Sequence, residues 1–105
     1  MTTFDKREEA FEKRFAIDEE LKFKAEARRN RLLGLWAAEH LGLSGDAATA
    51  YARETVAAAF AQGGEATVVA RVAGDLSAKG ITEDAIRMHM RELMVQAIAQ
   101  VKAGT

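Results

Sequence analysis

Proline is absent from all 105 residues of this chain, and its absence restricts the fold more than any other feature of the sequence. Proline interrupts the hydrogen bonds of a helix interior, so long helices can form here without a built-in break. Strand signals are weak, because Val68 and Val69 are the only adjacent β-branched aliphatic residues and they lie within a helical pattern. The sequence therefore predicts an all-α fold.

Four helices are expected, at about residues 3–41, 46–62, 65–79 and from 82 onward, with glycine after each of the first three. Ser44 and Thr82 are the expected N-caps, and Gly80 is expected to take a left-handed conformation at a helix end. Ile81 and Ile86 have the spacing of a hydrophobic staple. The short connections favour antiparallel neighbours and hence a four-helix bundle.

Apolar residues recur at helical spacing and predict the face that each helix buries. We expect the first helix to bury Leu21, Ala25, Leu32 and Trp36, and the second to use its bulky residues Tyr51, Val56 and Phe60. The third and fourth helices are expected to bury two longer stripes, which are Val69, Val72 and Leu76, and Ile86, Met90, Leu93, Ala97 and Val101.

The first 31 residues have an unusual composition for a core helix, with nine basic and eight acidic residues. Phe4, Phe11 and Phe15 recur at intervals of seven and four, which places them on one helical face. Charged side chains surround that face, as in a helix that binds a groove through aromatic anchors. Alternatively, the first helix is long and its phenylalanines cover one end of the bundle. We favour the partner-binding interpretation and predict a flexible or partly helical arm at 1–18 and a bundle at 19–105.

Catalytic and metal-binding patterns have little support. Cysteine is absent, and Ser44 and Ser77 lie at expected helix ends where capping or turn roles suffice. His89 and Glu92 share a helix face, but the order is the reverse of the Glu-x-x-His motif of di-iron bundles and no second copy occurs. We therefore expect neither an enzyme nor a metal site.

The formal net charge of −1 gives no indication of nucleic-acid binding, and no apolar run is long enough to span a bilayer. Without an evident secretory signal, a cytoplasmic location is the default. One basic cluster (Lys22, Lys24, Arg28, Arg29 and Arg31, with Trp36 nearby) has the residue types that could stack on and neutralise a nucleotide or an RNA phosphate. Its candidate nucleotide-binding residues are Lys24, Arg28, Arg29 and Trp36. Acidic residues are interspersed, so a solvated helix face is the favoured alternative.

Two segments resemble a known family. They are MTTFDKREEAFE at residues 1–12 and FKAEARRNRLLGLWAAE at residues 23–39. Both are similar to the zeta subunit of the alpha-proteobacterial F-type ATP synthase, and the similarity extends over nearly the whole chain. It implies a monomeric four-helix bundle whose N-terminal arm blocks ATP hydrolysis.

The resemblance further implies that the arm enters a catalytic interface between the alpha and beta subunits, near gamma. The bound protein would then lie at the cytoplasmic face of the inner membrane. No cofactor is implied, although weak ATP or ADP binding is compatible with the basic cluster. The helical face gives the expected contact residues, which are Phe4, Asp5, Arg7, Glu8, Phe11 and Phe15.

Overall fold

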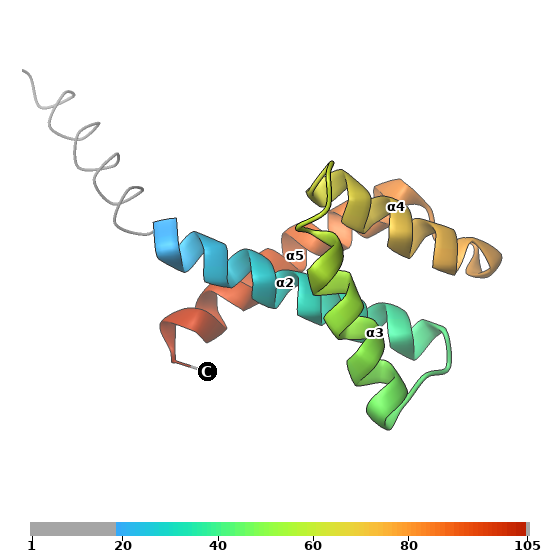
Figure 1. Cartoon of the computed structure of the whole chain (residues 1–105), viewed down its shortest axis with the longest axis horizontal. Helices are drawn as coiled ribbons and strands as arrows, with labels where there is room; N and C mark the ends of the chain where they lie inside the picture. The colour runs from blue at the N-terminus through green and yellow to red at the C-terminus, as the bar shows by residue number, and fades with distance from the viewer. Residues whose placement is uncertain (1–18, 105) are drawn as a thin grey trace, which may run out of the picture.

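The computed structural model describes residues 19–104, and the elements found there are all helical. They follow the predicted order and confirm the all-α four-helix bundle (Figure 1). The predicted arm lies outside the described residues. The elements are α2 (Glu19–His40), α3 (Gly45–Ala58), α4 (Glu65–Leu76), the 3-10 helix η1 (Ser77–Lys79) and α5 (Glu83–Lys102).

Helices α3 and α5 both pack against α2 along most of its length. Figure 1 shows α3 crossing α2 obliquely, whereas α4 lies away from the start of α2. At the α2–α3 crossing, a Cβ atom placed on Gly34 would lie 2.6 Å from the Cα atom of Ala52. The two backbones can approach this closely because glycine has no side chain.

The core joins all four α-helices. Helices α4 and α5 bury the predicted stripes, with Val101 half-buried at the end of α5. The buried residues of this cluster are Leu33, Ala37, Ala38, Tyr51, Val68, Val69, Val72, Leu76, Ile86, Met90 and Leu93.

The predicted apolar faces of the first two helices are only partly correct. In α2, Ala25 is fully buried, but Leu32 and Trp36 are half-buried and Leu33 lies at the centre of the core. Because two helices pack on different sides of α2, a single stripe does not describe its buried surface. In α3, Tyr51 is buried while Phe60 lies beyond the helix and is 69% exposed.

Helix ends agree with the predicted signals at most positions. The Thr82 hydroxyl accepts a hydrogen bond from the Ala85 N–H at 3.1 Å, and Gly80 is left-handed with φ 74°. Ser44 occupies the N-cap position of α3 without a side-chain capping bond. Helix α3 ends at Ala58 instead of continuing to 62, because the next amides bond to carbonyls three residues back and tighten the chain into turns.

A polar clip joins α3 to α4. The Tyr51 hydroxyl donates to Asp75 Oδ2 at 2.6 Å, and Arg71 Nη2 lies 2.7 Å from Glu54 Oε2. The Arg71 guanidinium also lies 5.2 Å from the centre of the Tyr51 ring. Burial, together with the hydrogen bond to Asp75, raises the pKa of Tyr51 well above its ordinary value of 10. The clip therefore holds its tyrosine in the neutral, donating form.

Gly34→Ala should destabilise the bundle. Alanine improves helix propensity by up to about 1 kcal/mol, but overpacking against Ala52 and Thr55 costs about 1–3 kcal/mol. We expect urea denaturation, monitored by circular dichroism, to show a net decrease in the free energy of unfolding. The matched control is Gly74→Ala in α4, where the added Cβ meets no atom within 4 Å. This substitution should stabilise the bundle. A Gly34→Ala variant as stable as the wild type would contradict the close crossing.

Tyr51→Phe should lower the free energy of unfolding by about 1–2 kcal/mol at neutral pH, since it removes a hydrogen bond to a carboxylate. The folded-state pKa of Tyr51 is raised, so its stabilisation is present below about pH 10 and is lost as the pH rises further. The difference between wild type and variant should therefore shrink in alkaline solution. A constant difference from pH 7 to 11 would contradict this assignment.

Candidate functional site

The six predicted partner-binding residues all precede α2, which begins at Glu19. Phe4, Asp5, Arg7, Glu8, Phe11 and Phe15 lie outside the described residues, so this site stays a prediction. The structure does describe the surface that directly follows them in the chain, and that surface is hollowed.

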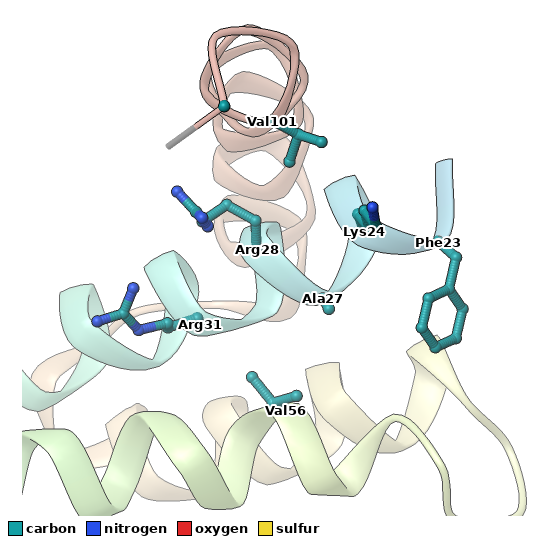
Figure 2. Close-up of a pocket in the computed structure, with 8 residues that line it drawn as sticks. Phe23, Lys24, Ala27, Arg28, Arg31, Val56 and Val101 are labelled. Carbon is teal, nitrogen blue, oxygen red and sulfur yellow. The ribbon is translucent and has the colours of Figure 1, made fainter. Parts of the chain in front are cut away.

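A groove of about 540 Å³ lies along the first half of α2. Figure 2 shows α2 between Val56, which comes from α3, and Val101, which comes from α5. The groove therefore depends on the packing of three helices. Its lining residues are Phe23, Lys24, Ala27, Arg28, Arg31, Val56, Val101 and Gly104.

Three basic residues occupy successive turns of α2 along this groove. Arg28 Nη1 donates to Gln100 Oε1 at 2.9 Å, which ties α2 to the end of α5 across 72 positions of sequence. Lys24 Nζ lies 3.3 Å from Glu20 Oε1, in an ion pair whose two side chains are exposed. Arg31 is exposed beside them. Exposed pairs of this kind contribute little energy, so Lys24 can exchange its partner at low cost.

Aromatic surface continues from the groove toward the end of α3. Phe23 is 59% exposed and its ring centre lies 6.3 Å from that of Phe60. A second, smaller hollow of about 340 Å³ lies beside the pair, and Val56 lines both hollows. The start of α2 thus presents apolar and cationic groups together.

The structure separates the residues of the predicted nucleotide cluster. Lys24 and Arg28 line the groove, but Arg29 reaches toward α4, with its Nη1 atom 3.6 Å from Glu65 Oε1. Trp36 lies two turns further along, about 12 Å from Arg28 by helix rise. Its ring centre is 4.7 Å from that of His40 and 4.5 Å from that of His89. Trp36 therefore contacts the chain's two histidines rather than the cations.

Two of the groups weighed for catalytic or metal-binding roles have local partners. The Ser77 hydroxyl donates to the Gly74 carbonyl at 3.0 Å, and His89 Nδ1 lies 3.5 Å from Glu92 Oε2. Across residues 19–104, no group of three or more potential ligands is arranged to hold a metal ion. In the same range, no helix has both the length and the apolar character required to cross a membrane.

The sequence reasoning missed three features of this surface. The contact of Phe23 with Phe60 joins residues 37 positions apart, and the Arg28–Gln100 bond joins α2 to α5. The groove itself requires the crossing of α2 with two neighbours. Each feature depends on tertiary packing, which the sequence does not reveal. The available signal for this surface was a phenylalanine and several basic residues at helical spacing in the segment that forms α2.

Comparison with known proteins identifies the family. A family model described as ATPase inhibitor subunit zeta matches residues 1–100, which include the predicted arm and nearly all of the described bundle. A search of curated proteins found no match. Since the family model covers almost the whole sequence, the chain belongs to the ATPase inhibitor subunit zeta family.

Proposed function

We propose that the chain inhibits ATP hydrolysis by inserting residues 1–18, as a helix, at an alpha/beta catalytic interface of F1 near gamma. Membership of the ATPase inhibitor subunit zeta family supports an inhibitory role at ATP synthase. The subunits contacted and the insertion of the arm are the parts that we propose. In this proposal the bound protein lies at the cytoplasmic face of the inner membrane.

The observation that supports this assignment most strongly is the extent of the family match. It includes residues 1–18, whereas the core of the described chain is built from α2, α3, α4 and α5. In this proposal the aromatic face of residues 1–18 binds a partner, while the four described helices supply the core of the bundle. Exposed phenylalanines without a partner would be a liability for a soluble protein.

The physical requirements of such a block are modest. Eighteen helical residues extend about 27 Å, enough to enter a subunit interface. Phe4, Phe11 and Phe15 would supply buried anchors, with Asp5, Arg7 and Glu8 at the rim. Ordering the arm costs conformational entropy, which aromatic burial and charge-assisted hydrogen bonds offset. A mechanical block requires no catalytic group and no cofactor in the inhibitor.

Nucleotide sensing is the alternative that the basic cluster suggested. We rank it lower, because Trp36 contacts His89 and Arg29 lies near Glu65, whereas Lys24 and Arg28 line the groove. No other feature of the described residues favours a nucleotide. Inhibition of ATP hydrolysis therefore remains the proposed function.

Deletion of residues 1–18 should abolish inhibition of ATP hydrolysis by cognate F1. The bundle should persist, because its core lies in the four described helices. Hydrolysis assays should be paired with circular dichroism and Trp36 fluorescence, which confirm folding. Inhibition by the truncated chain equal to that of the full-length chain would contradict the proposal.

A full-length variant can distinguish the contribution of the aromatic face to inhibition from the contributions of the arm's length and charge. Replacing Phe4, Phe11 and Phe15 together by alanine should raise the half-maximal inhibitory concentration at least about a hundredfold, since each buried anchor is worth about 2 kcal/mol. The matched control is Met88→Ala with Val95→Ala, which truncates exposed apolar residues of α5. Equal inhibition by the two variants would argue against aromatic anchoring.

A further inference from the structure

We propose that the groove along α2 is a second docking surface, which binds an acidic, partly apolar surface of F1 beside the site of the arm. This inference rests on the proposed function, because it takes F1 as the partner. It assigns a role to Phe23, Lys24 and Arg31, which the arm mechanism does not use. Three properties of the groove identify the partner: the positive charge of its lining, its exposed apolar residues, and the closeness of those residues to the arm in the sequence.

The charge of the groove indicates an acidic partner. Among the described residues that line it, Lys24, Arg28 and Arg31 are basic and none is acidic. Lys24, Arg28 and Arg31 are spaced by four and three residues, so they follow one side of α2 for about 10 Å. A row of cations on a rigid helix favours an opposing row of carboxylates and accelerates encounter with it.

The apolar part of the groove indicates a protein surface rather than a small anion. Phe23 is more than half exposed, and Val56 and Val101 flank α2 in Figure 2. Protein interfaces combine such apolar centres with a charged rim, and arginine and phenylalanine are enriched in them. An acidic helix or loop with a few apolar side chains fits both properties of the groove.

The groove lies close to the arm in the sequence, so a partner that binds the arm can also reach the groove. Phe23 follows residue 18 by five positions and Arg31 follows it by thirteen, which correspond to about 8 and 20 Å of helix rise. A partner that encloses residues 1–18 therefore has its outer surface within reach of the groove. The two surfaces together would form one continuous interface.

The helices that form the groove are preorganised in the free protein. The Arg28–Gln100 hydrogen bond links α2 to α5, and Ala25 and Leu33 on α2 are fully buried in the bundle. Residues on packed helices lose little additional freedom on association, which favours affinity.

A second copy of the chain is the competing occupant. In a symmetric dimer across this groove, the same surface of each copy would meet, and its cations would oppose one another. Such like-charge contacts are unfavourable, so we assign the groove to an acidic partner instead. Sedimentation of the full-length chain tests this choice directly.

The test uses the full-length double variant Phe23→Ala/Arg31→Glu, in which the arm is unchanged. We expect its apparent affinity for F1 to fall at least about tenfold, mostly through slower association, with a weaker dependence on salt. At saturating concentration it should still inhibit as completely as the wild type, because the arm performs the block. Association and dissociation rates can be measured with immobilised F1.

Two controls accompany this variant. Met88→Ala/Arg87→Glu makes the same kinds of change at exposed positions of α5, about 20 Å along that helix from Val101, and should bind like the wild type. Arg31→Lys keeps the positive charge and should bind within about threefold of the wild type, since an exposed arginine acts here mainly through its charge. Circular dichroism establishes that each variant is folded.

The outcomes separate this inference from the proposed function. Wild-type affinity in the double variant, with inhibition still lost on deletion of residues 1–18, would overturn the groove assignment alone. Retained inhibition in the truncated chain would instead overturn the arm mechanism. Self-association of the wild type that the double variant abolishes would assign the groove to a second copy and also overturn the inference.

Discussion

The packing of α2 against two helices at once determines the rest of the structure. On one side Gly34 admits the backbone of α3 at Ala52, and on another Arg28 bonds to Gln100 of α5. Small residues on α2, including the buried Ala37 and Ala38, keep the helices close. A helix held in this way is stiff, so its exposed side between α3 and α5 has a defined shape. The groove is a consequence of that arrangement.

The same packing suggests a division of labour within the inhibitor. The described bundle has its own core and its own polar ties, including the clip between Tyr51 and Asp75. The proposed block is assigned to residues 1–18, which continue directly into α2 in the sequence. In this account the bundle presents the arm and aligns the groove, while the arm supplies the obstruction. Neither part requires a reactive side chain.

The sequence was sufficient to predict local features but not tertiary contacts. The Thr82 cap, the left-handed Gly80 and the stripes of α4 and α5 follow from spacing within a single helix. The burial of Leu33, the end of α3 at Ala58 and the position of Trp36 against His89 depend on neighbours distant in sequence. From the sequence, Lys24 and Arg28 were candidates for binding a nucleotide, and the groove between three helices that they line was not predicted.

Site-specific cross-linking offers the most direct test of arm insertion, the central claim. The chain has no cysteine, so Ala10→Cys provides a single attachment point within the arm for a photoreactive probe, and Ala78→Cys provides an exposed control in η1. In the inhibited complex with F1, the account predicts adducts of position 10 with the alpha and beta subunits and none of position 78. Adducts from position 78, with none from position 10, would contradict insertion of the arm.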